Sequence, residues 1–115
     1  RARDMPRERN EVVVIMWRDI PAQIKGKAGA DKHQVILPHR FQKAIDRAAM
    51  VAGKKTAHEY VGEWRRISSP VVQHMAAEVE ATAAALEAQF PPERLRTLID
   101  NGGWDPVTTT EAASQ

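Results

Sequence analysis

The chain has 115 residues, of which 43% are hydrophobic and 28% charged, so one domain of ordinary size is expected. It contains no cysteine, which excludes disulfides, thiolate metal sites and a cysteine nucleophile. No uncharged apolar stretch reaches the length of a membrane span. We therefore expect a soluble, cytoplasmic, mostly globular protein with no membrane contact.

Basic and acidic residues are distributed unevenly along the chain. Residues 1–66 contain 15 Lys and Arg against 8 Asp and Glu, whereas residues 67–115 contain 2 against 7. The two parts therefore carry formal charges of +7 and −5, although the whole chain carries +2. The basic part can attract nucleic acid, phosphate or an acidic partner, or it can lie against the chain's own acidic part.

The first third of the chain has the pattern of short strands. Residues 1–10 are charged and aperiodic, which predicts a mobile basic arm. The β-branched run at residues 11–17 predicts a buried strand, and Pro21 soon after it predicts a turn or a bulge. Residues 22–27 and 33–37 are candidates for an edge strand and a third strand. Together these segments indicate an antiparallel meander.

Helical periodicity begins at Pro38, where apolar residues start to recur at steps of three and four. Gly53 is a suitable left-handed cap for the first helix. Thr56 and Glu59 have the spacing of a capping box, which predicts the start of a second helix. The helices are predicted at residues 38–52, 56–66 and 69–90, with a short fourth one around residues 95–99.

These elements predict an α+β fold. A small antiparallel sheet of two to three strands within residues 11–37 is expected to be covered by three to four helices within residues 38–101. The single domain is expected to span residues 11–103, and residues 104–115 are expected to form a disordered tail.

The sequence contains no pattern typical of a catalytic or metal site. The four histidines lie on different predicted elements, and only His74 and Glu78 have the i, i+4 spacing that places two ligands on one helix face. Because a third ligand is missing, we expect neither a metal nor a cofactor. A nucleophile elbow, a Walker loop and a dinucleotide-binding glycine motif are also missing from the sequence. We therefore expect no catalytic residue, and a small enzyme built on Arg18, Asp19 and the histidines ranks last.

The segment from Trp17 to Gln23 is the first candidate contact surface. A rigid strand followed by a turn fixed by proline positions side chains for binding. In the alternative interpretation Trp17 fills the core, while Arg18 and Asp19 satisfy the turn backbone or each other. We predict recognition for Arg18 and a structural role for Asp19. The candidate partner-binding residues here are Trp17, Arg18 and Gln23.

The helix predicted at residues 69–90 is the second candidate contact surface. Small and apolar residues extend nearly all the way round it, which favours burial on more than one side. Because alanine is also the best helix former, helix propensity is the competing explanation. Ala77, Ala81 and Ala84 are the candidate residues for contact with a protein partner or a second copy of the chain.

Basic residues suggest a function of a different class. Lys25, Lys27, Arg40, Lys43 and Arg47 form a weak candidate anion-binding face, with Lys32 beside it. A solvated basic surface is the simpler interpretation, and no aromatic residues are interleaved in the way that nucleic-acid stacking requires. Nucleic acid is therefore a less favoured partner than protein.

Three segments together resemble a known family. They are Val14–Gln23, which contains W-R-D-I-P-A-Q, Arg40–Met50, which contains A-I-D-R-A-A-M, and Glu63–Arg66. In combination they are similar to the small bacterial virulence factor domain family, over about residues 11–66. The family name does not describe an activity, and the motifs carry no catalytic assignment.

The resemblance implies a role in one-carbon metabolism. Short members of the family are similar to proteins associated with methylenetetrahydrofolate reductase-like proteins and corrinoid methyl-transfer proteins. The implied function is a non-catalytic accessory subunit of a folate- or corrinoid-dependent system. The alternative, from the residues alone, is an anion- or nucleic-acid-binding module that uses the basic half of the chain.

Overall fold

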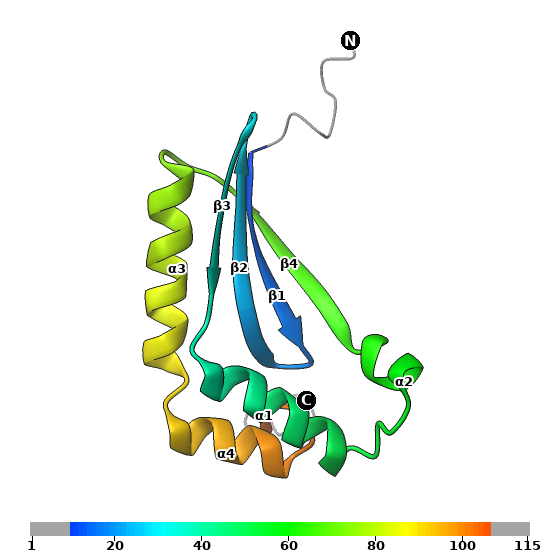
Figure 1. Cartoon of the computed structure of the whole chain (residues 1–115). Coiled ribbons are helices and arrows are strands. Elements are labelled where there is room, and N and C mark those ends of the chain that lie inside the picture. The colour runs from blue at the N-terminus through cyan, green and yellow to red at the C-terminus, as the bar shows by residue number, and fades with distance from the viewer. Residues whose placement is uncertain (1–9, 107–115) are drawn as a thin grey trace, which may run out of the picture.

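In the computed structural model, which describes residues 10–106, four strands form an antiparallel sheet and four helices lie against one face and one end of it (Figure 1). The α+β class is therefore confirmed, with one strand more than predicted. The strands have the spatial order β3-β2-β1-β4 and are β1 (Glu11–Trp17), β2 (Ile20–Ala28), β3 (Asp31–Ile36) and β4 (Trp64–Pro70). The helices are α1 (His39–Val51), α2 (Ala57–Val61), α3 (Met75–Gln89) and α4 (Pro92–Asp100).

The irregularity predicted at Pro21 is a β-bulge inside β2. Ile15 of β1 opposes Gln23, whereas its neighbour Met16 opposes Pro21, so Ala22 is the extra residue. A bulge is one of the few positions where a sheet tolerates the missing N–H of proline. As a result β2 continues through Pro21 and begins at Ile20, earlier than the predicted start of the second strand.

β4 was not predicted. It replaces the end of the second predicted helix and the start of the third. The second helix was expected to reach Arg66 and the third to begin at Ser69, but α2 ends at Val61 and residues 64–70 pair with β1 along its whole length. Most residues of β4 are exposed, so no face of the strand needs apolar side chains. Its sequence therefore lacks the alternation of apolar and polar residues that is typical of a half-buried strand. The free edge of β1 specifies this strand through long-range backbone pairing, which a local sequence pattern does not reveal.

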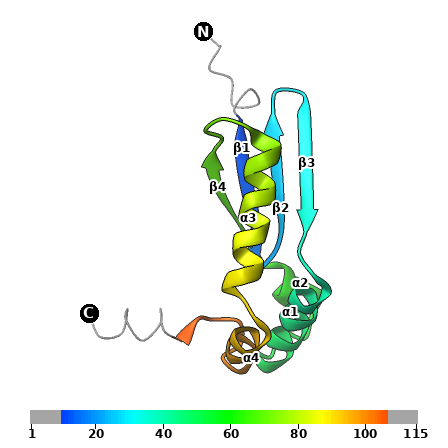
Figure 2. The ribbon, with the colours of Figure 1, turned by 90° about the vertical axis from the view of Figure 1, so that its left-hand side faces the viewer.

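α3 covers one face of the sheet and lies in front of β1 and β2 in Figure 2, and it also contacts β3. The approach is close at Gly26 of β2, where a Cβ atom would lie 2.5 Å from both Met75 Sδ and a methyl carbon of Val79. Glycine is therefore required at this position because any side chain would push the helix away.

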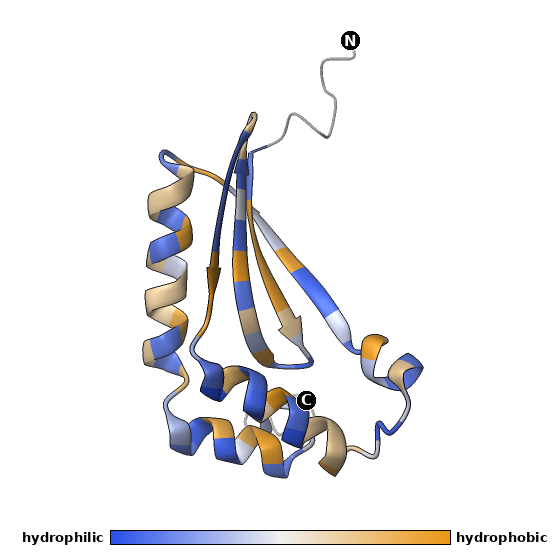
Figure 3. Cartoon of the chain, viewed as in Figure 1, coloured by the Kyte–Doolittle hydropathy of each residue, from blue (hydrophilic) through white to orange (hydrophobic). Residues whose placement is uncertain are grey.

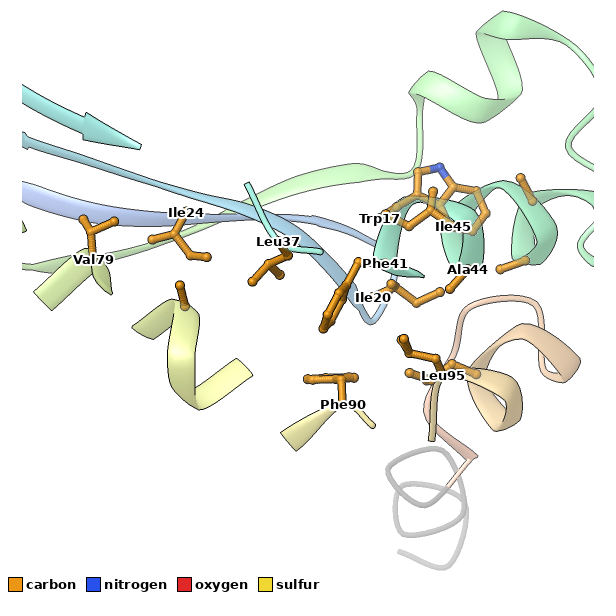
Figure 4. Close-up of a cluster of buried hydrophobic side chains, with 14 of the residues drawn as sticks. Trp17, Ile20, Ile24, Leu37, Phe41, Ala44, Ile45, Val79, Phe90 and Leu95 are labelled. Carbon is orange, nitrogen blue, oxygen red and sulfur yellow. The ribbon is translucent and has the colours of Figure 1, made fainter. Parts of the chain in front are cut away.

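The core lies between the sheet, α3 and the α1–α4 pair (Figure 4). Trp17, Ile24 and Val79 are fully buried, as is Ile45 of α1, while Phe41 is 1% exposed and packs edge-on against Phe90 at a ring-centroid distance of 6.2 Å. Each such side chain contributes about 1.5–3 kcal/mol when it leaves water.

Two helix starts depend on glutamate side chains. The capping box predicted at Thr56 and Glu59 is present, with each side chain accepting a backbone N–H from the other residue. α3 begins at Met75 because the carboxylate of Glu78 folds back and accepts hydrogen bonds from the backbone N–H groups of the three residues before the helix. These residues are Val72, Gln73 and His74, at 2.6–3.1 Å.

Both predicted terminal segments lie largely outside the described residues. The basic arm falls on residues 1–9 apart from Asn10, and the tail falls on residues 107–115 apart from its first three residues. Among the described helices, none is both long and apolar enough to cross a membrane.

Candidate functional site

The hairpin between β1 and β2 is held in an unusual backbone conformation. Arg18 follows Trp17 and has φ 53°, in the left-handed region that favours glycine. Trp17 is fully buried, stacks on Tyr60 at a centroid distance of 5.8 Å and donates its indole N–H to the Tyr60 carbonyl at 2.8 Å. The side chain of Trp17, a candidate for partner binding, therefore has no exposed surface to offer and belongs to the core.

Arg18 points into the molecule. Its guanidinium lies between the rings of Trp17 and Trp104, at 5.2 and 4.9 Å from their centroids, within the range of cation–π attraction. Nη1 donates to the Gly102 carbonyl at 2.9 Å, and Nε lies 3.2 Å from the Glu63 carboxylate, as an ion pair rather than an aligned hydrogen bond. With its side chain 11% exposed, Arg18 joins the hairpin to the segments that precede β4 and follow α4.

Asp19 completes this network. Its carboxylate accepts from Arg65 Nη2 at 2.8 Å and from the backbone N–H of Asp105 at 2.8 Å. The Asp19 N–H in turn donates to the Gly103 carbonyl at 2.9 Å. The structural role predicted for Asp19 agrees with these contacts, but its partners are β4 and the segment after α4 rather than Arg18. The expected tail therefore starts in contact with the domain.

The pKa of Glu63 is lowered, first by the adjacent Arg18 guanidinium and then by Lys54, while partial burial opposes the shift. Lys54 Nζ lies 3.3 Å from the second carboxylate oxygen of Glu63. We call Trp17, Arg18, Asp19, Glu63 and Arg65 the hairpin cluster. Each of its charged groups has an oppositely charged partner, and these pairs join the hairpin to β4 and to the segment before it.

The face of the sheet opposite α3 carries exposed and half-buried side chains apart from Val13, which is 3% exposed, and we call it the open sheet face. Gly26 faces α3, so Lys25 and Lys27 on either side of it point to the other face. The hydropathy of successive residues alternates along β2 in Figure 3. Cross-strand partners share a face, which assigns the remaining members. The open sheet face comprises Glu11, Val13, Ile15, Gln23, Lys25, Lys27, Lys32, Gln34, Ile36, Arg66, Ser68 and Pro70.

Four cations of the open sheet face lie close together. Lys25, Lys27, Lys32 and Arg66 all line one open cavity of about 240 Å³, together with Glu11, Val13 and Gly26. Within residues 10–106 none of the four cations makes an ion pair. Arg66 was not among the predicted anion-binding residues, because it was assigned to a helix. Gln23, predicted to bind a partner, lies on this face and accepts a hydrogen bond from Gln34.

The other predicted basic residues lie elsewhere, on α1. Arg40, Lys43 and Arg47 line a groove of about 180 Å³ between α1 and α4, where Arg96 joins them over apolar residues that include Leu95. Arg40 is already used in the fold, since its Nη2 donates to the carbonyls of Glu87 and Phe90 at 3.1 and 3.3 Å. The structure therefore divides the five predicted anion-binding residues between two separate surfaces.

The alanines of α3 form a stripe on the side that faces away from the sheet. At 3.6 residues per turn, Ala77, Ala81 and Ala84 lie opposite the sheet-facing Val79 and Ala83. All three predicted contact alanines are exposed, and Ala88 continues their stripe. The outward side of α3 is therefore a surface of methyl groups without a partner in residues 10–106.

The histidine and carboxylate pairs of the described residues form no metal cluster of three or more ligands. His33 Nε2 lies 2.8 Å from Glu80, which ties β3 to α3. Glu78, the second member of the predicted i, i+4 pair with His74, is occupied by three backbone N–H groups at the start of α3. These bonds, first the one from Gln73, lower the pKa of Glu78.

Comparison with known proteins identifies the family. No curated protein and no solved structure matched the chain. A family model described as "Virulence factor" matches residues 15–99, which extends beyond the segment of resemblance through β4, α3 and nearly all of α4. Since this match covers most of the chain, including both the hairpin cluster and the alanine stripe, the protein belongs to the virulence factor family.

Proposed function

We propose that this protein is a small non-catalytic accessory subunit that binds a protein partner through the outward side of α3. The observation that carries the proposal is the stripe of Ala77, Ala81, Ala84 and Ala88, exposed on a helix whose opposite side is already buried against the sheet. A helix that is apolar on both sides favours a second packing partner.

The chemistry of the stripe suits another helix. The distance between packed helices depends on the side chains at the contact, and methyl groups allow the closest approach for residues with a Cβ. Glu80 and Glu87 are exposed on the same helix and would attract basic residues of a partner. Val72, 82% exposed just before α3, is a further apolar side chain available for contact.

The proposed partner is a folate- or corrinoid-dependent one-carbon enzyme, of the methylenetetrahydrofolate reductase-like or corrinoid methyl-transfer class. This part of the proposal is based on the family resemblance. The hairpin residues Trp17 and Arg18 act in it as support for the fold, because their contacts lie within the chain.

The test replaces Ala77, Ala81 and Ala84 together with glutamate, and compares this variant with one that carries serine at the same positions. The tagged proteins are purified from the native host, the partners are identified by mass spectrometry, and self-association is measured by analytical ultracentrifugation. We expect the glutamate variant to lose the one-carbon enzyme or the dimer while the serine variant keeps it. Normal assembly of a folded glutamate variant would show that the alanines serve only helix formation.

An anion- or nucleic-acid-binding module is the second candidate. It is favoured by the unpaired cations of the open sheet face. Salt separates the two candidates, because phosphate contacts weaken steeply as counterions compete, whereas an interface of methyl groups does not.

A further inference from the structure

We propose that the open sheet face binds the phosphate backbone of a single-stranded nucleic acid. The proposal deepens the second candidate function and is independent of the role proposed for α3, since the alanine stripe and the open sheet face lie on opposite sides of the molecule. It adds Arg66 to Lys25, Lys27 and Lys32, and it excludes the basic residues of α1.

The four cations form a diagonal band across the sheet. Lys27 and Lys32 are cross-strand partners, Lys25 lies two residues along β2, and Arg66 lies two strands away on β4. From strand spacings of about 4.8 Å and a rise of about 3.3 Å per residue, the band runs over about 20 Å. A polymer with regularly spaced charges can contact such a band at several points along its length.

The charge of this face is not neutralised by its neighbours. Glu11 is the one acidic residue among those assigned to the open sheet face, and its carboxylate accepts a hydrogen bond from Ser68 Oγ at 2.6 Å rather than pairing with a lysine. The face therefore carries a net formal charge of +3 and is complementary to an anionic polymer.

The residue types favour phosphate over a protein partner. Lysine is depleted in protein–protein interfaces, whereas phosphate oxygens are contacted mainly by Arg, Lys and by polar side chains such as Ser and Gln. The open sheet face supplies three lysines, one arginine, Gln23, Gln34 and Ser68. Exposed Ile36 at one margin of the sheet adds apolar surface for a sugar or base.

The shape of the sheet favours a single strand over a duplex. The axes of the two outer strands lie about 14 Å apart, wider than the major groove of about 12 Å, so the whole face cannot enter a duplex groove. Because the assigned face holds no aromatic residue for base stacking, binding is electrostatic and independent of base sequence. This is the physical consequence of the missing aromatic residues noted in the sequence.

The test measures fluorescence anisotropy of a labelled oligothymidylate of about 15 nucleotides. For four phosphate contacts, the logarithm of the binding constant is expected to fall with the logarithm of the salt concentration with a slope of about −2.8. This slope is equivalent to about a fifty-fold loss of affinity between about 50 and 200 mM salt. The double variant Lys25→Glu/Lys27→Glu is expected to bind at least about tenfold more weakly, with a slope reduced to about −1.4. The matched control Lys43→Glu/Arg47→Glu, on α1, makes the same change in net charge and should lose less than about twofold.

Several outcomes would overturn the proposal. They are no binding by the wild type, equal losses in the two charge-matched variants, and tighter binding of poly-glutamate than of the oligonucleotide, which would identify a surface for acidic polypeptides. Thermal melts establish that each variant is folded, and Lys25→Gln/Lys27→Gln replaces the glutamate variant if that one fails to fold. The α3 glutamate variant should bind the oligonucleotide normally, so failure of the partner proposal and of this one are distinguishable.

Discussion

Arg18 occupies the hairpin position with a left-handed φ of 53°, a conformation that costs a residue other than glycine about 1 kcal/mol. Its guanidinium makes an ion pair with Glu63, a hydrogen bond with the Gly102 carbonyl and two ring contacts. These contacts offset the backbone cost. The position of Arg18 after a rigid strand predicts recognition, but its contacts favour a role in folding.

Substitutions at Arg18 separate the backbone from the side chain. Arg18→Ala loses a charged hydrogen bond, worth about 1.5–3 kcal/mol, and ring contacts worth about 0.5–1 kcal/mol, while the strain remains. We expect a loss of about 2–4 kcal/mol and a fall in Tm of 10 °C or more, by about 4–8 °C per kcal/mol. Arg18→Gly relieves the strain and should be about 1 kcal/mol more stable than the alanine variant. Thermal melts check both, and a glycine variant more stable than the wild type would show that the side chain contributes nothing to folding.

At the scale of elements, the contact between α3 and the sheet depends on Gly26. α3 packs against β2 and β3 more extensively than against β1, and the side chains of Met75 and Val79 fill the space beside this glycine. α3 can pack this close to the sheet because β2 has no side chain at position 26.

Gly26→Ala is therefore expected to destabilise the protein by about 1–3 kcal/mol through overpacking. The double variant Gly26→Ala/Val79→Ala should lose less than the sum of the two single losses, because the smaller residue at position 79 makes room for the new methyl group. Urea unfolding of the four proteins gives the coupling free energy. Additive losses would indicate that the helix moves instead of clashing.

At the scale of the whole molecule, three glutamates connect stability to pH. The pKa of Glu59 is lowered mainly by the backbone N–H of Thr56, that of Glu63 by Arg18, and that of Glu78 by the N–H of Gln73. In each case the folded pKa lies below the ordinary value of 4.5. Each group therefore contributes stability that is present above pH 4.5 and is lost as the pH falls through the folded pKa.

We expect Tm to fall as the pH is lowered from about 5 to about 3. Glu63→Gln and Glu78→Gln should have a lower Tm than the wild type at pH 7 and a smaller decrease in acid, so that the curves converge. Glu87→Gln is the control, since Glu87 is exposed and its carboxylate makes no contact within residues 10–106. Parallel curves for the wild type and both variants would contradict these assignments.

The sequence by itself determined the features that depend on neighbouring residues. The strand at 11–17, the start of α1 after Pro38 and the capping box at Thr56 and Glu59 follow from local periodicity and hydrogen bonding, and the structure contains all three. The alanine stripe follows from helical spacing in the same way, although its binding role stays a prediction. The family was also recognisable from motifs within the first 66 residues.

Only the tertiary structure decided what depends on residues far apart in the chain. β4 forms because β1 has a free edge, and the polar partners of Arg18 and Asp19 lie 45–86 residues away, at positions that no spacing rule connects. The pairing of β4 with β1 brings Arg66 onto the face that holds Lys25. Lys43 and Arg47 belong to α1 and line the groove between α1 and α4. Backbone hydrogen bonds between distant strands carry no local signature, so a mostly exposed edge strand and the charges that it positions become visible only in the folded chain.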